Sequence, residues 1–115
     1  MIKGSCHCGT VTYQMQETPE SMVTCNCSIC RKLNTTWAHS DRTKMTLNAP
    51  EGTTHTYSWG EHLVFHTCKT CGCTTHWMAK DASRYAVNCQ LASEADMEGI
   101  RVRRFDGADT WEFLD

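Results

Sequence analysis

The sequence predicts a small, mainly β domain of antiparallel sheet with little helix. Its 115 residues allow one domain with a marginal core. Several short segments alternate apolar and polar residues, as strands with one buried face do, and turn residues separate them. The nine cysteines are numerous enough to stabilise a core of this size by crosslinks or metal binding. We therefore expect residues 1–115 to form a single domain whose loops carry the cysteines.

The clearest strand pattern lies in residues 10–15, where Val11, Tyr13 and Met15 would share one face. Weaker alternation predicts five further strands, over residues 54–59, 63–66, 74–79, 85–91 and 100–105. Two turn signals, Pro50-Glu51-Gly52 and Gly60, separate some of these segments.

Helix signals are few. One short helix is expected to begin after Cys30, at Arg31-Lys32-Leu33. A second is expected over residues 93–98, because Ser93 can cap its start and Gly99 can follow its end.

Charge and hydropathy exclude several classes of function. The formal net charge is -2 and the basic residues are scattered, so the chain lacks the basic surface of a nucleic-acid-binding protein. The densest basic stretch is 101–104, and we expect Arg101 and Arg103 to lie on one solvated strand face. The chain opens without an apolar signal region, and no apolar run approaches the ~20 residues that span a bilayer. We therefore expect a cytoplasmic protein with reduced thiols and with no nucleic-acid or membrane partner.

The cysteines fall into groups that suit zinc better than disulfides, because the count is odd and the expected compartment is reducing. Zinc prefers four tetrahedral ligands, and two thiolates from one short turn can converge on it. Four cysteines in two pairs make one complete structural site: Cys6, Cys8, Cys68 and Cys71. Such a site contributes on the order of 10 kcal/mol to folding, comparable with the whole stability of a small domain.

The middle group contains Cys25, Cys27 and Cys30 and has no fourth cysteine beside it. Three protein ligands with an open position are typical of a catalytic zinc. A fourth ligand from elsewhere, such as Cys73, Cys89 or a histidine, would instead close a second structural site. The spacing is compatible with both interpretations.

Several other residues have simple structural interpretations. Cys89 lies in a strand pattern and is expected to be a buried thiol. Arg31 and Lys32 either offset the charge of the second group or are solvated, and the six histidines are expected to be structural or solvated. The four tryptophans are expected to belong to the core: Trp37, Trp59, Trp77 and Trp111.

Three segments together resemble the signature of the glutathione-dependent formaldehyde-activating enzyme family, which also contains the conserved domain of centromere protein V. They are residues 4–13 (GSCHCGTVTY), 25–32 (CNCSICRK) and 68–72 (CKTCG). Residues 87–91 and 110–111 also resemble the closing strands of that family. The resemblance implies an Mss4-like fold of antiparallel sheets. It also implies a structural zinc on the four paired cysteines and a catalytic zinc with an open position on Cys25, Cys27 and Cys30.

The same resemblance implies a carbon–sulfur lyase whose partner is a small-molecule thiol or thiol adduct. In reverse, glutathione adds to formaldehyde and gives S-(hydroxymethyl)glutathione. The alternative is a non-catalytic, zinc-stabilised binding module, because the family also contains centromere protein V. A fourth protein ligand on the middle group would favour this alternative.

Overall fold

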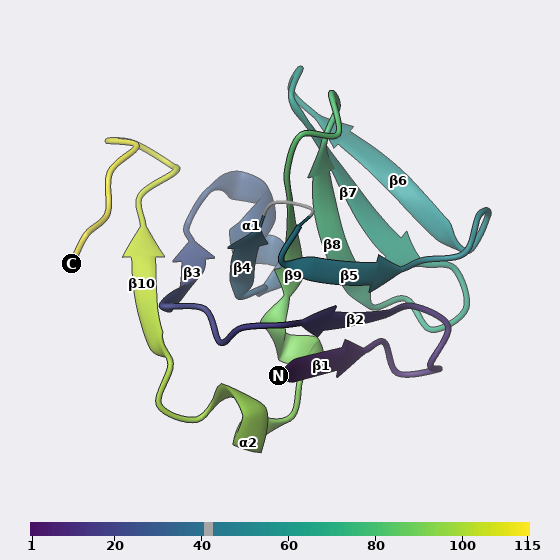
Figure 1. The fold of residues 1–115 in the computed structure, drawn as a ribbon. Helices are drawn as coiled ribbons and strands as arrows, with labels where there is room; N and C mark the ends of the chain where they lie inside the picture. Colours follow the sequence, from purple (N-terminus) through teal and green to yellow (C-terminus); the bar gives the residue numbers. More distant parts are fainter. Residues whose placement is uncertain (41–42) are drawn as a thin grey trace.

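The computed structural model describes residues 1–40 and 43–115, and its mainly β fold confirms the predicted class (Figure 1). The smaller sheet has the order β1-β2-β5, with β1 (Ile2–Ser5), β2 (Thr12–Met15) and β5 (Met45–Asn48). The larger sheet has the order β10-β3-β4-β9-β8-β7-β6. Its strands are β3 (Ser21–Cys25), β4 (Trp37–Ser40), β6 (Thr54–Trp59), β7 (Leu63–Cys68), β8 (Thr74–Ala79), β9 (Tyr85–Asn88) and β10 (Arg101–Phe105).

Helix is limited to α1 (Ser28–Leu33), η1 (Cys89–Leu91) and α2 (Glu94–Met97) in the described part of the chain. Helix α1 begins before the expected position because the Cys27 side chain caps it, accepting from the Cys30 amide. The expected cap of α2 is confirmed, since the Ser93 hydroxyl accepts from the Asp96 amide at 3.1 Å. No helix among the described residues is long and apolar enough to cross a membrane.

The predicted strands are largely confirmed. Strands β6 and β8 have the predicted bounds, β2 begins at Thr12 rather than at Thr10, and β7 continues to Cys68. Strand β9 ends at Asn88, so the prediction of strand through Leu91 was wrong, and the chain makes the 3-10 turn η1 there. Four strands were not predicted: β1, β3, β4 and β5.

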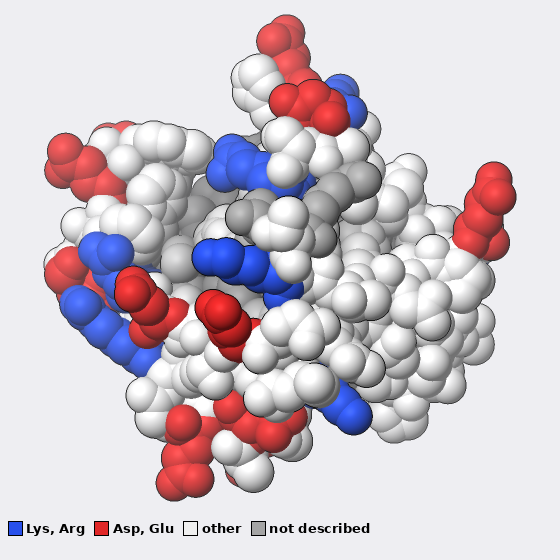
Figure 2. Space-filling model, viewed as in Figure 1, with Lys and Arg blue, Asp and Glu red and all other residues white. Residues whose placement is uncertain are grey.

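The pairing is antiparallel except between β10 and β3, which run parallel from Arg101 opposite Ser21 to Phe105 opposite Cys25. The predicted antiparallel architecture therefore does not extend to this edge of the larger sheet. The expectation for the arginines also holds only in part. Arg101 is exposed, but the Arg103 guanidinium lies over the Phe113 ring, 3.6 Å from its centroid. Figure 2 shows acidic and basic side chains interspersed over one face of the molecule.

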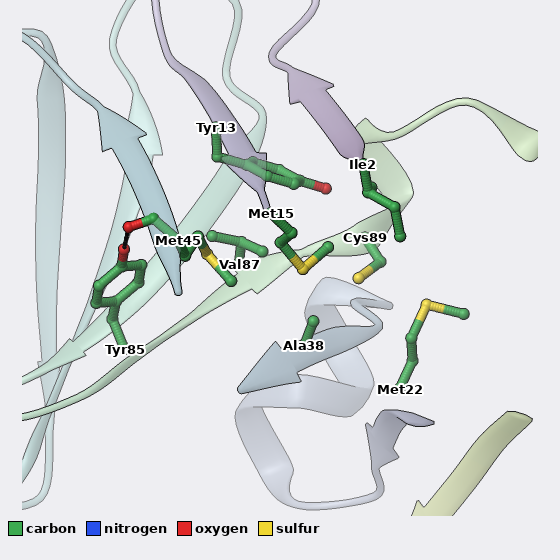
Figure 3. Close-up of a cluster of buried hydrophobic side chains, with 9 residues drawn as sticks. All are labelled: Ile2, Tyr13, Met15, Met22, Ala38, Met45, Tyr85, Val87 and Cys89. Atoms are coloured by element: carbon green, nitrogen blue, oxygen red, sulfur yellow. Dashed lines mark hydrogen bonds between the residues drawn. The ribbon is translucent and has the colours of Figure 1, made fainter. Parts of the chain in front are cut away.

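The core between the two sheets is made largely of tyrosine, methionine and small apolar side chains (Figure 3). Two tyrosines connect the sheets in opposite directions. The Tyr13 hydroxyl donates to the Asn88 carbonyl at 3.0 Å, and the Tyr85 hydroxyl donates to the Met45 carbonyl at 2.8 Å. The Tyr13 ring lies so close to Gly4 that a Cβ there would collide with it.

Strand β9 shows that the larger sheet is covered on both faces, because all four of its residues are buried. Tyr85 and Val87 belong to the inter-sheet core. Ala86 points the other way and packs with Trp37 and Trp77. A second apolar layer thus lies on the face opposite the small sheet, and this layer contains Cys27 and Cys30.

Candidate metal centres and the aromatic pocket

Cys6, Cys8, Cys68 and Cys71 come together as the sequence predicts, and we call them the four-cysteine cluster. Their sulfur atoms all lie within 4.8 Å of one another. The Cys8 sulfur is 3.7 Å from that of Cys6 and 3.6 Å from that of Cys68. Four sulfurs at about 2.3 Å from a central zinc are about 3.8 Å apart. The donor set and spacing therefore fit a tetrahedral zinc ion.

The two turns that carry these cysteines have the same local design. The Gly9 amide donates to the Cys6 carbonyl at 3.0 Å, and the Gly72 amide donates to the Cys68 carbonyl at 2.9 Å. Gly9 has φ of +87° and Gly72 has φ of +79°, a conformation that glycine adopts without a steric penalty. The Val11 amide also donates to the Cys6 sulfur at 3.3 Å, and such outer hydrogen bonds orient metal ligands.

Hydrogen bonds favour the thiolate form at two members of this cluster, Cys71 and Cys8. Backbone amides of Cys73 and Cys8 lower the pKa of the Cys71 thiol to about 5. The hydroxyl and amide of Thr10 lower the pKa of Cys8. A metal ion binds thiolates, so these contacts reduce the cost of deprotonating these two ligands.

The other cysteines do not supply a ligand to the middle group. Cys73 packs beside Cys6 and Cys68 of the four-cysteine cluster. Cys89 is fully buried in the inter-sheet core, where burial raises the pKa of its thiol to about 12. The expectation of a buried thiol at position 89 is confirmed.

Cys25, Cys27 and Cys30 also come together, and we call them the three-cysteine cluster. Cys25 ends β3, and Cys27 and Cys30 belong to the cap and first turn of α1. Their sulfurs lie within 4.8 Å of one another, which again suits a metal ion of tetrahedral preference. Within residues 1–40 and 43–115, no histidine, aspartate, glutamate or fourth cysteine joins the group at this distance.

The three-cysteine cluster is held by its surroundings. The Cys30 amide donates to the Cys27 sulfur at 3.4 Å, and the Trp37 indole donates to the Cys30 sulfur at 3.4 Å. Burial raises the pKa of both Cys25 and Cys30. These thiols therefore keep their protons near neutral pH unless a cation such as zinc displaces them.

The three-cysteine cluster forms part of the wall of a hollow of about 250 Å³, which we call the aromatic pocket. All four tryptophans line it, although the sequence suggested only a core role for them. Trp37 and Trp77 are also buried and belong to the core. Its apolar lining is completed by Val23, Leu63, Phe65, Phe105 and Phe113.

Two polar side chains of the aromatic pocket were missed by sequence reasoning, His39 and Arg84. The Arg84 guanidinium lies over the Trp77 ring at 5.4 Å, and the His39 ring meets Trp77 edge-on at 5.5 Å. His39 lies in β4 and Arg84 lies in the turn before β9. These segments are far apart in the sequence and become neighbours only when β4 pairs with β9, so no local motif indicates that the two residues share a pocket. Arg31 and Lys32, which the sequence suggested, are exposed on α1 and do not line the pocket.

His39 lies where the aromatic pocket adjoins a second hollow lined by Lys44 and Glu20. Its side chain is exposed to solvent through these hollows, and its ring also packs against Trp77. This partial desolvation, together with the positive charge of Arg84, lowers the pKa of His39. The imidazole is therefore neutral at pH 7.

Two other histidines, His66 and His76, lie outside the aromatic pocket. Their rings stack on each other, with centroids 4.2 Å apart.

The fold and the two clusters define a small β protein with two candidate zinc centres, one of them opening on a pocket. The chain belongs to the glutathione-dependent formaldehyde-activating enzyme family, whose model matches residues 1–102. Its fold is similar to that of a Rhodobacter sphaeroides protein of known crystal structure, with a TM-score of 0.68. The two share 23% identity, and the alignment covers 87% of this chain and 98% of the other.

Proposed function

We propose that the protein is a zinc-dependent carbon–sulfur lyase that acts on a small thiol adduct such as S-(hydroxymethyl)glutathione. Cys25, Cys27 and Cys30 would hold the zinc of the reaction centre, and the four-cysteine cluster would hold a structural zinc. The observation that carries this proposal is the three-cysteine cluster in the wall of an accessible pocket. A purely structural site has four protein ligands, whereas a catalytic one leaves a position for substrate.

The reaction is redox-neutral. In the direction of addition, the thiolate sulfur forms a bond to the carbonyl carbon, and the π electrons of the carbonyl move to its oxygen, which takes up a proton. In the lyase direction, the hydroxyl loses that proton, the carbonyl re-forms, and the C–S bond breaks with its electrons on sulfur. Zinc, when bound, would lower the pKa of the substrate thiol below its usual ~8.5.

We assign the proton transfer to His39. Besides the cysteines, it is the one described side chain in the pocket lining that can gain and lose a proton near neutral pH. Its lowered pKa keeps the imidazole neutral, so that it can accept the thiol proton and then give it to the alkoxide oxygen formed by the addition. Arg84 is exposed beside it and would attract a carboxylate carried by the substrate thiol.

Metal analysis and exchange kinetics test the proposal. Protein prepared with zinc and reductant should contain two zinc ions per chain. Two-dimensional exchange NMR should then show exchange between glutathione and S-(hydroxymethyl)glutathione faster than the spontaneous reaction. Cys27→Ser should abolish this acceleration and release one zinc, whereas Cys73→Ser, outside both clusters, should change neither. Two bound zinc ions without acceleration would refute the lyase and favour a zinc-stabilised binding module.

A further inference from the structure

We propose that the aromatic pocket selects thiol adducts whose sulfur-bound carbon group is aromatic or comparably apolar, and that Trp111 and Phe113 determine this selectivity. The inference deepens the proposed function and rests on it, because it assumes that the substrate sulfur lies at the three-cysteine cluster. It concerns the carbon group bonded to that sulfur. For formaldehyde, which the family name specifies, this group would be a single hydroxymethyl carbon.

The first observation is the composition of the pocket. Seven aromatic rings line it, four from tryptophan and three from phenylalanine. Arg84 is its one lysine or arginine among the described residues. A hydroxymethyl group would leave most of this apolar surface facing water. A ring-sized group on the same sulfur would cover it, and the benefit grows with the apolar area removed from water.

The second observation is the segment that brings three of these rings to the pocket. Residues 105–113, the C-terminal strap, fold back beside the end of β10, where Phe113 bridges to Phe105 (Figure 1). The Phe105 ring meets both Trp111 and Phe113 edge-on, with centroids 5.1 Å apart in each pair. The Arg103 guanidinium covers Phe113. The strap therefore presents a fixed group of rings.

The strap is attached directly to the loop that carries the cysteines. The Asn26 side chain, between Cys25 and Cys27, donates to the Asp106 carboxylate at 3.0 Å. The same side chain accepts from the Ala108 amide at 3.0 Å. The strap rings are thus positioned relative to the ligands, and they can contact whatever is bound at the sulfur cluster.

The third observation is the exposure and conformation of the strap rings. The family model matches residues 1–102, so the resemblance of residues 110–111 to the family's closing strands is not part of that match. Trp111 is 65% exposed and Phe113 is 40% exposed, so neither ring is buried in the core. Trp111 also has φ of +60°, an unfavourable conformation for a large side chain. Rings held at a pocket rim in this way are suited to contact a ligand.

Thiol binding tests the inference without relying on turnover. Zinc-loaded protein is titrated under anaerobic conditions with phenylmethanethiol and with 2-mercaptoethanol, and binding is followed by calorimetry and tryptophan fluorescence. We expect phenylmethanethiol to bind at least tenfold more tightly. Phenylmethanol, which has the same ring without the sulfur, should bind much more weakly than the thiol.

Trp111→Ala and Phe113→Ala should each reduce the preference for the aromatic thiol by about threefold or more, with zinc content and circular dichroism unchanged. Leu114→Ala is the matched control, since Leu114 is 52% exposed but does not line the pocket. Equal affinities for the two thiols, or a preference that survives both aromatic substitutions, would overturn the inference. An aromatic preference without accelerated exchange would uphold this selectivity and refute only the lyase.

Discussion

Replacing Gly107 with alanine should weaken zinc binding at the three-cysteine cluster without touching a ligand. A Cβ at this position would lie 2.6 Å from the Cys25 sulfur and 3.2 Å from the Cys27 Cβ. Ordinary contact begins near 3.4 Å, so the sulfur must move by about 0.8 Å, the difference between 3.4 and 2.6 Å. Metal–ligand distances tolerate only about 0.2 Å. Rotating the Cys25 side chain away would relieve the clash and remove one ligand.

We expect the zinc affinity of this cluster to fall about 10-fold to 100-fold, the range typical of changes next to metal ligands. This corresponds to about 1.4 to 2.7 kcal/mol. Competition with a chromophoric zinc chelator should show one weakened site and one unchanged site. Ala108→Gly, which alters the next residue of the same strap without adding atoms, should leave both sites unchanged. Unaltered affinity in Gly107→Ala would contradict the reasoning, because the strap and not the sulfur would then have moved.

Three further predictions concern the four-cysteine cluster, the core between the sheets and His39. Cys8→Ser should remove the structural zinc and several of the ~10 kcal/mol that it contributes, which metal analysis and thermal unfolding would detect, whereas Cys73→Ser should keep both ions. Tyr13→Phe should lower the free energy of unfolding of the zinc-saturated protein by about 1 kcal/mol through the lost hydrogen bond between the sheets. Tyr57→Phe, on an exposed edge strand, should leave the urea midpoint unchanged. The pKa of His39 lies below the usual histidine value of ~6.5. Its imidazole therefore stays neutral, and able to act as a base, until the pH falls below that value. Exchange should therefore stay fast at pH 7 and slow at lower pH, and His39→Gln should remove this acidic limb and reduce the rate about 100-fold. An identical pH profile in wild type and variant would exclude His39.

Sequence reasoning found all three six-residue strands, β6, β7 and β8, but only three of the seven shorter ones. A longer strand gives an alternating sequence pattern more residues in which to appear, although the burial in β6 and β8 does not itself alternate strictly. Strand β4 could not be found because Trp37 and Ala38 are both buried, on opposite faces of a sheet that is covered on both sides. The parallel pairing of β10 with β3 joins segments far apart in the chain, and no local pattern reports such a contact.

The candidate site shows the same division between local and long-range information. The spacing of Cys25, Cys27 and Cys30 within one loop and one helical turn is local, so the sequence could predict their convergence. The wall of the aromatic pocket is not local, because its tryptophans come from β4, β6, β8 and the C-terminal strap. The sheet order places them together, and the same order brings Arg84 to Trp77.

The positions of the two clusters in the fold fit the different roles that we propose for them. The four-cysteine cluster joins the turn after β1, in the small sheet, to the turn after β7, in the large sheet. A metal ion bound there would tie the two sheets together, in addition to their shared core and the two tyrosine hydrogen bonds. The three-cysteine cluster draws all its sulfurs from the adjacent β3 and α1, so a metal ion there would close no long loop and would contribute little chain-entropy stabilisation. Under the proposed function, we therefore expect metal at the four-cysteine cluster to contribute more to the stability of the fold than metal at the three-cysteine cluster.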